Sequence, residues 1–261
     1  MAVFNQFWDE FTNAFSRLPV WLLGSPMQLG DIGVIDRRGW EKVTTLEALG
    51  IKPIPRRVES DVSYSYASGD AVQISALAHA EAGQALAGAE AAAGMRMAFK
   101  RGGAFVVRAE NCRHSQIDNM LEVDERLRSL GESGAGWRTR RWVLVSQITT
   151  AQPCIVVVAG SAGAEAVVEI QGTGGVSNLA EVVAARGSLQ LTREESLDAR
   201  ILSVKRVPLM WRGKVRRKWP LSGLRDLGRD DLAAASPEGS SDPDELVDFL
   251  AAALDIPERA E

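Results

Sequence analysis

The feature of this chain that most constrains its fold is an alternation of apolar and polar side chains with a period of two. It runs through residues 72–82, slips by one position after Gly83, and returns in residues 95–99. Alanine is abundant here and has a high helix propensity, so propensity alone predicts a helix. A period of two instead places every second side chain on one face of a strand, and Gly88 and Gly94 disfavour a helix. We favour strands and keep the helix as the alternative.

Short apolar runs separated by turn signals predict further strands on both sides of this segment. They fall at residues 20–23, 30–35, 40–43, 105–107, 142–148, 153–158, 164–170, 188–191 and 199–207. Because blocks of strands are separated by few helices, the order is that of an α+β fold, unlike the regular alternation of a doubly wound fold. We predict a twisted, mostly antiparallel central sheet with flanking helices and a short C-terminal helix.

Two helices are predicted within the first 131 residues. The first has an aromatic stripe with helical spacing and ends before Pro19; the stripe consists of Phe4, Phe7, Trp8, Phe11 and Phe15. We expect this stripe to pack on the core, and contact with lipid or a partner is the alternative. The second helix is predicted to begin near Ser115, where Asp118 completes a capping-box-like pattern, and to end at Gly131.

Composition indicates a globular, soluble chain that is not secreted. The 261 residues are 46% hydrophobic and 25% charged, which is ordinary for a folded protein. Two cysteines, Cys112 and Cys154, are too few for a disulfide framework, and we expect buried thiols in a reducing cytoplasm. No secretion signal is recognised at the N-terminus, and no run of about 18 apolar residues encodes a membrane-spanning helix.

Motifs for catalysis are weak. Cys112 and His114 are close in sequence, but a nucleophile and its base need a spatial geometry that adjacency does not supply. Residues 159–163 lack the first glycine of a nucleophile elbow, and residues 172–175 lack the lysine of a phosphate-binding loop. No metal-ligand spacing is present. We predict no enzymatic activity and no catalytic, cofactor-binding or metal-binding residues; a deep pocket around His114 would instead favour an enzyme.

Charge is segregated along the chain. Residues 226–261 contain eleven acidic and two basic side chains, a net charge of −9, whereas the whole chain carries −4. Residues 1–225 therefore carry +5. On this basis we divide the chain into a basic, β-rich body of residues 1–227, a linker of residues 228–241 and an acidic C-terminal tail of residues 242–261.

The linker and the tail have the composition of a cleavable segment and an amphipathic helix. Arg229 is the candidate cleavage site in the linker. Asp242 and Pro243 form a helix start, and Pro257 ends the helix. The predicted contacts of the tail to the body are Leu246, Val247, Leu250 and Leu254. Their burial contributes roughly 5–10 kcal/mol before ordering costs, so the tail is held largely by its tether and would leave when the linker is cut.

Positive side chains of the body cluster beside tryptophans. The candidate contacts to acidic lipid are Arg138, Arg140, Arg141, Arg212, Lys214, Arg216, Arg217 and Lys218, with Trp137, Trp142, Trp211 and Trp219 beside them. Each Lys or Arg near an anionic membrane contributes about 1 kcal/mol, and Trp favours the headgroup zone. The same residues would suit the phosphates and bases of nucleic acid, or they could lie in solvated loops.

The order of these elements resembles that of the gasdermin family, and the total length and tail size are similar to those of bacterial members. The layout has an N-terminal amphipathic helix, a small strand-rich region, the alternating Ala/Gly-rich stretch, a helix around residues 121–127, a Val-rich strand, a second hairpin region and a C-terminal segment. The closest local likeness is residues 141–150, which are similar to the long central strand of gasdermin pore-forming domains.

This resemblance implies an autoinhibited, pore-forming protein of bacterial cell death and antiphage defence. A protease would remove the tail, and copies of the chain would then oligomerise on acidic lipid and extend two hairpin regions, about residues 72–108 and 143–205, into a pore. The inactive protein would be cytoplasmic and the active one in the inner membrane, without nucleic acid as a partner. Bacterial members typically carry a lipid-modified cysteine near the N-terminus, whereas none precedes Cys112 here. The alternative function is a basic binding module for nucleic acid or an acidic partner, masked by the acidic tail.

Overall fold

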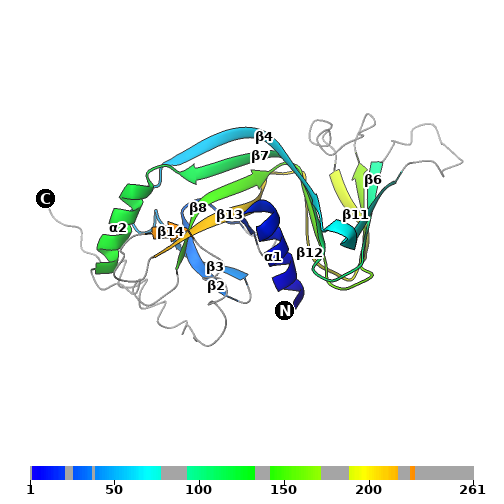
Figure 1. Ribbon diagram of the computed structural model, residues 1–261. Helices are drawn as coiled ribbons and strands as arrows, with labels where there is room; N and C mark the ends of the chain where they lie inside the picture. The colour runs from blue at the N-terminus through cyan, green and yellow to red at the C-terminus, as the bar shows by residue number, and fades with distance from the viewer. Residues whose placement is uncertain are drawn as a thin grey trace, which may run out of the picture. The chain divides into compact units, whose positions relative to one another are not determined.

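The computed structural model describes residues 2–20, 26–36, 39–77, 93–132, 142–171, 188–216 and 224–226. Within these ranges the helices are α1 (Ala2–Phe15), the short 3-10 helix η1 (Gly69–Ala71) and α2 (Met120–Glu132). The strands are β1 (Leu18–Pro19), β2 (Asp31–Asp36), β3 (Gly39–Thr45), β4 (Pro55–Ala67), β5 (Val72–Leu77), β6 (Ala93–Phe99), β7 (Phe105–Ile117), β8 (Val143–Ala151), β9 (Cys154–Ala159), β10 (Glu165–Gln171), β11 (Ser188–Glu195), β12 (Leu197–Ser203), β13 (Val207–Arg216) and β14 (Leu224–Asp226) (Figure 1).

These strands belong to two sheets. The main hydrogen-bonded path of the larger sheet is β1-β13-β8-β7-β9-β12, with β14 on β13, β2 on β8, β3 on β2 and β4 on β7. The smaller sheet has the order β11-β10-β6-β5. Pairing is antiparallel within both, as between β7 and β9 and between β6 and β10. The predicted α+β class with a mostly antiparallel sheet is confirmed, while the predicted C-terminal helix lies outside the described residues.

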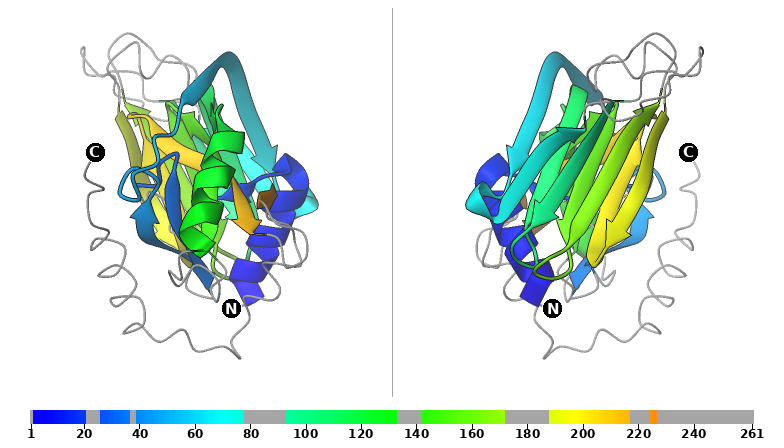
Figure 2. Two further views of the ribbon diagram at one scale, coloured as in Figure 1. Left: turned by 90° about the vertical axis from the view of Figure 1, so that its left-hand side faces the viewer. Right: turned by 90° about the vertical axis from the view of Figure 1, so that its right-hand side faces the viewer.

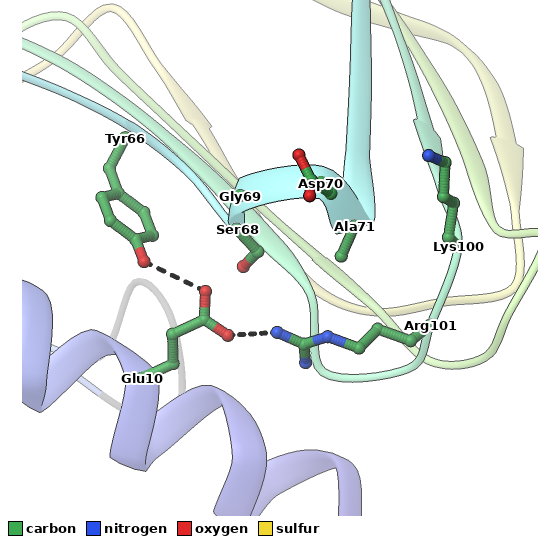
Figure 3. A pocket seen from close by; sticks show the side chains of 8 residues that line it. All are labelled: Glu10, Tyr66, Ser68, Gly69, Asp70, Ala71, Lys100 and Arg101. Carbon is green, nitrogen blue, oxygen red and sulfur yellow. Dashed lines mark hydrogen bonds and ion pairs between the residues drawn. The ribbon is translucent and has the colours of Figure 1, made fainter.

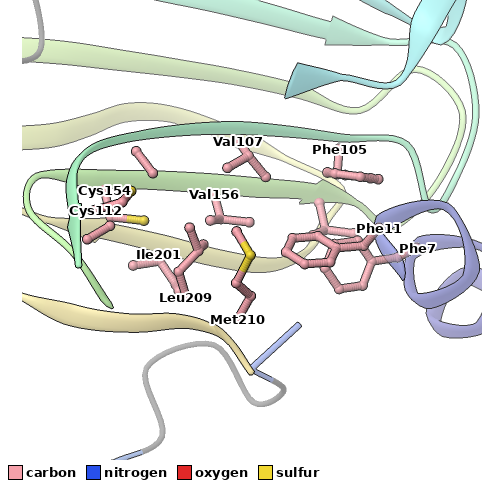
Figure 4. Packing of buried hydrophobic residues seen from close by; sticks show 13 residues of the cluster. Phe7, Phe11, Phe105, Val107, Cys112, Cys154, Val156, Ile201, Leu209 and Met210 are labelled. Atoms are coloured by element: carbon pink, nitrogen blue, oxygen red, sulfur yellow. The ribbon is translucent and has the colours of Figure 1, made fainter. Parts of the chain in front are cut away.

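The chain divides into two compact units, the first made of residues 1–26, 57–114 and 149–211. In this unit, side chains of β7 and β9 alternate between two cores, as expected for strands covered on both faces. One core contains Phe105 and Val107 together with Phe7 and Phe11 of α1 (Figure 4). The other contains Val106 together with residues of the smaller sheet.

The second unit comprises residues 27–56, 115–148 and 212–261. Its core is formed by Ile32, Leu46, Ile51, Ile117, Val123, Leu127, Trp142 and Leu144. The prediction that α2 begins near Ser115 is wrong, because β7 continues to Ile117, whose side chain is buried. Instead Asn119 precedes the helix, and its Nδ2 donates to Glu122 Oε2 at 2.9 Å while its Oδ1 accepts from the Ile54 amide at 2.8 Å.

Several strand predictions need correction. The strand predicted over residues 105–107 continues to Ile117, and β1 lies at Leu18–Pro19, outside the predicted residues 20–23. The segment that became β4 was not predicted as a strand, although Val62, Tyr64 and Tyr66 alternate with serines in its second half. The single strand predicted over residues 199–207 is divided, since β12 ends at Ser203 and β13 begins at Val207. None of the described helices is long and apolar enough to cross a membrane.

Candidate functional site

The most distinctive part of the first unit is the smaller sheet, which we call the hairpin sheet (β5, β6, β10 and β11). It consists of the β5–β6 and β10–β11 hairpins, joined by the pairing of β6 with β10 (Figure 2, right). Because neighbouring strands are antiparallel throughout, β5 and β10 run in the same direction and their C-terminal ends lie at the same end of the sheet. The strand interpretation is thus confirmed for residues 72–77 and 93–99, whereas residues 78–92 lie outside the described part.

The two faces of the hairpin sheet differ in polarity. On one face, Met97 lies opposite Ile74 and Ala166, and Met97 and Ala166 are fully buried against the larger sheet. On the other face, Glu165 Oε2 lies 3.9 Å from Arg96 Nη2 and 3.5 Å from Arg193 Nη1. Both arginine side chains are about half exposed. The sheet therefore has an apolar face packed against the larger sheet and an ionic face turned away from that core.

Each strand of the hairpin sheet continues across a short corner into a strand of the larger sheet. The corners are residues 68–71 (β4 to β5), 100–104 (β6 to β7), 160–164 (β9 to β10) and Ser196 (β11 to β12). Every corner contains a residue with positive φ: Gly69 at 38°, Gly103 at 72°, Gly163 at 79° and Ser196 at 54°. This left-handed conformation is easy for glycine and strained for serine. The order β5-β6-β10-β11 repeats the order β4-β7-β9-β12, so the corners form one row, here called the hinge line.

Hydrogen bonds join each corner to its neighbour along the hinge line. The Lys100 amide donates to the Ala71 carbonyl, and the Gly163 amide to the Phe99 carbonyl, both at 2.8 Å. The Gly160 amide donates to the Ser196 carbonyl, also at 2.8 Å. These bonds connect the four bends in one row.

Helix α1 lies against the second corner. The Tyr66 hydroxyl donates to Glu10 Oε1 at 3.1 Å, and Arg101 forms an ion pair with Glu10 Oε2 (Figure 3). Tyr66 comes from the end of β4 and Arg101 from the corner between β6 and β7, so one carboxylate of α1 connects two neighbouring strands. Burial and the hydrogen bond to Glu10 both raise the pKa of Tyr66, which keeps this hydroxyl a donor. Lys100 and Asp70 complete the shallow pocket around these groups.

The aromatic stripe of α1 packs into the core beside the same corner. Phe7, Trp8 and Phe11 are buried, and the ring centroids of Phe7 and Phe105 are 5.0 Å apart with edge-to-face geometry (Figure 4). Phe105 is the first residue of β7, directly after the second corner. The predicted docking of this helix on the core is confirmed, and these three side chains are not presented to lipid in this conformation.

The predicted lipid-binding residues are only partly described. Arg212 is exposed and Lys214 half-buried on β13, and Arg216 lies in the same strand. Arg138, Arg140, Arg141, Arg217 and Lys218 lie outside the described residues, as do Arg229, Leu246, Val247, Leu250 and Leu254.

The two tryptophans of the basic clusters that the structure describes belong to the core. Trp211 is fully buried, with its indole N–H donating to the Pro19 carbonyl at 3.1 Å, and Trp142 is 2% exposed. The expected interleaving of exposed tryptophan with positive charge is therefore wrong at these positions.

The Cys112 and His114 pair has the opposite electrostatics from a nucleophile and its base. Burial raises the pKa of the Cys112 thiol to about 11, which disfavours the thiolate that a nucleophile requires. His114 Nδ1 lies 2.8 Å from Thr149 Oγ1, and its Nε2 lies 3.3 Å from the Tyr64 hydroxyl. Among the described residues no group of His, Cys, Asp and Glu has the spacing of a metal site.

Sequence reasoning did not identify Glu10, Arg101 or Gly103 as a site. The available signal was the adjacent pair Gly102-Gly103 between two strands, which indicates a tight turn. That a helix contacts this turn depends on tertiary packing and has no local signature.

Comparisons with known proteins give a likeness at the level of structure. No protein-family model matches the chain, and no curated protein matches its sequence. Among solved structures, it is similar to a bacterial gasdermin from Bradyrhizobium tropiciagri, with 11% sequence identity and a TM-score of 0.35 over 85% of this chain and 90% of that one. At this level the likeness assigns no role to any residue of this chain.

Proposed function

We propose that this chain is a gasdermin-like, autoinhibited pore-forming protein that permeabilises membranes after its C-terminal tail is removed by proteolysis. The observation that carries the proposal is the hairpin sheet, whose four adjacent strands have one apolar face and one ionic face. A strand that spans a membrane in a barrel needs the same alternation, apolar toward lipid and polar toward the lumen. The apolar face now contacts the larger sheet, so the side chains that would face lipid are stored in a folded core.

The hinge line supports this conversion. If the positive-φ residues become extended, β4 and β5 form one long strand, and so do β6 with β7, β9 with β10, and β11 with β12. A spanning strand needs about 9–11 residues, and β5 and β6 have 6 and 7. Residues 72–99 and 165–195 each supply enough chain for two spanning strands and a turn.

Oligomerisation is the physical reason for the proposed pore. Four spanning strands cannot close on themselves around water, and their outer edges would carry unpaired backbone groups that are costly in lipid. Pairing β5 of one copy with β11 of the next would satisfy both edges and generate a ring. We therefore propose other copies of this chain as partners, together with acidic lipid and an activating protease.

We attribute autoinhibition to electrostatic attraction between the acidic tail and the basic body. Residues 226–261, which include the acidic tail, carry a net charge of −9, whereas residues 1–225 carry +5. We propose that the tail shields the basic residues, including Arg212 and Lys214, until the linker is cut near Arg229. In a bacterial cell-death or antiphage setting, the intact chain would then be cytoplasmic and the cut chain would act at the inner membrane.

Dye release from vesicles tests this proposal. A recognition sequence for a specific protease is placed within residues 231–241, and the protein is added to dye-loaded vesicles that contain phosphatidylglycerol. Addition of the protease should release the dye, while the uncut chain and vesicles of phosphatidylcholine alone should show little release. Intact vesicles after complete cleavage and proven departure of the tail would contradict a pore former.

The same cut protein distinguishes the pore former from the alternative function, a masked binding module. Salt-sensitive binding of the body to single-stranded DNA, with vesicles left intact, would favour a masked binding module. Release of dye from the vesicles without binding to single-stranded DNA would favour the pore former.

A further inference from the structure

We propose that α1 is a second lock on the hinge line, separate from the acidic tail, and that Glu10 fastens it. This inference rests on the proposed function, because a lock matters only if the hinge line straightens. It assigns a regulatory contact to residues that lie far in sequence from the tail.

The first support is the position of Glu10. Its two carboxylate oxygens contact Tyr66 on β4 and Arg101 in the second corner (Figure 3). The Glu10 side chain is 22% exposed and that of Arg101 is 42% exposed, so the ion pair is partly shielded from water. Straightening the corner between β6 and β7 would move Arg101 away from Tyr66, and one carboxylate could not then hold both.

The second support is the close approach of the α1 backbone to the corner. A Cβ at Gly103 would lie 2.8 Å from the Val3 carbonyl oxygen and 2.9 Å from Gln6 Cβ. A Cβ at Gly102 would lie 3.1 Å from Val3 Cγ2. The first turns of α1 therefore pack directly against this corner and leave no room there for an added methyl group.

The third support is the anchoring of α1 next to the hinge. Phe7 and Phe11 both contact the ring of Phe105, which follows the corner directly, with centroids 5.0 Å and 5.8 Å apart. The helix is thus fixed to β7 on one side of the bend and to the bend itself by Glu10. The corner stays bent while both attachments hold, so α1 must release its polar contacts before β6 and β7 become one strand.

Hydrogen exchange on the intact chain tests the lock without a membrane. Glu10→Ala removes both contacts, and Glu125→Ala is the matched control, because Glu125 is an exposed glutamate in the middle of α2. Loss of one charged hydrogen bond and one partly exposed ion pair predicts about 3- to 30-fold faster exchange at the Lys100 and Gly103 amides. The Val157 amide within β9 should keep its protection.

Two results would overturn the proposal. One is exchange at the corner no faster than in Glu125→Ala. The other is equal acceleration at Val157, which would mean that Glu10 contributes only to general stability.

A reversible cross-link tests the same lock during permeabilisation. Val3 Cγ2 stands 3.1 Å from where a Cβ at position 102 would be, close to the separation of a Cβ and the far sulfur across a disulfide. The Val3→Cys/Gly102→Cys protein with the cleavable linker, oxidised and then cut, should fail to release dye until a reductant is added. Equal release in the oxidised and reduced states would overturn the lock. If cut protein without the cross-link releases no dye, the proposed function fails, while the exchange experiment still decides whether α1 restrains the corner.

Discussion

Replacing either of two corner glycines by alanine separates the contact with α1 from the strain of the bend. Gly103 and Gly163 have similar positive φ angles, 72° and 79°. A Cβ at Gly163 meets no atom within 4 Å, whereas a Cβ at Gly103 meets the Val3 carbonyl oxygen at 2.8 Å. Gly163→Ala therefore measures the backbone term alone, and Gly103→Ala measures the same term plus displacement of α1.

The expected magnitudes follow from these two terms. Alanine in the left-handed region costs about 1–2 kcal/mol, and a smaller unfolded-state entropy offsets about 0.4–1 kcal/mol of it. Gly163→Ala should thus destabilise the protein by about 0–1.6 kcal/mol. Overpacking against the helix backbone adds about 1–3 kcal/mol for Gly103→Ala. The two variants should differ by that amount, which corresponds to roughly 2–12 °C in melting temperature for a chain of this size.

The comparison uses thermal and urea unfolding of the intact chain, followed by tryptophan fluorescence. The signal sums all seven tryptophans, of which Trp8 is buried in α1. Gly103→Ala should lower the transition midpoint further than Gly163→Ala. Equal midpoints for the two variants would refute the close approach of α1 to the corner, and with it the physical basis of the lock.

Four further outcomes are expected. Burial, with the positive charge of Arg17 nearby, lowers the pKa of His114 below its usual 6.5, so the folded state favours the neutral imidazole. Stability should therefore be full above pH 6.5 and decline as pH falls through the folded pKa. Unfolding midpoints at pH 8 and 5.5 should show a smaller decline in His114→Gln than in the unchanged protein. Burial raises the pKa of Cys112 to about 11 and that of Cys154 to about 12, so iodoacetamide at pH 8 should leave both thiols unmodified in the native protein and modify them in urea, as mass spectrometry would show. Phe11→Ala should destabilise by about 3–5 kcal/mol, since the ring is 1% exposed, whereas Leu121→Ala, with 88% of that residue exposed, should stay within about 0.5 kcal/mol in urea unfolding. Arg212→Glu should weaken binding of the cut protein to acidic vesicles more than the charge-matched Lys52→Glu, and equal weakening in a sedimentation assay would remove Arg212 from the lipid-binding set.

Local sequence patterns predicted the elements that are buried strongly on one face or almost completely. The aromatic stripe identified α1 because its phenylalanines recur on one helix face. The period of two identified β5 and β6, and there it outweighed the helix propensity of alanine because the Met97 face is buried in a sheet. Long apolar runs identified β8 and β9, whose side chains are almost all buried.

The remaining features depend on contacts between distant residues. β4 has only a short local signal, the alternation of Val62, Tyr64 and Tyr66 with serines, and its pairing with β7 provides the rest of the order. The capping pattern at Ser115 was misleading because burial of Ile117 keeps that segment in the sheet. Trp211 beside positive charge suggested a membrane contact, yet its indole is committed to the Pro19 carbonyl. Glu10 is recognised as a site only from the fold, which brings Tyr66 of β4 and Arg101 of the second corner to its carboxylate.

The central claim is that the hairpin sheet enters the membrane with its apolar face toward lipid and its ionic face toward water. Single cysteines at residues 72, 73, 74 and 75 of the protein with the cleavable linker, each labelled with an environment-sensitive fluorophore, test this most directly. After cleavage on acidic vesicles, labels at residues 72 and 74 should shift to the blue and be quenched by lipid-borne quenchers, while labels at residues 73 and 75 should be quenched from water. Four labels that all stay in water while the vesicles release their dye would contradict the claim.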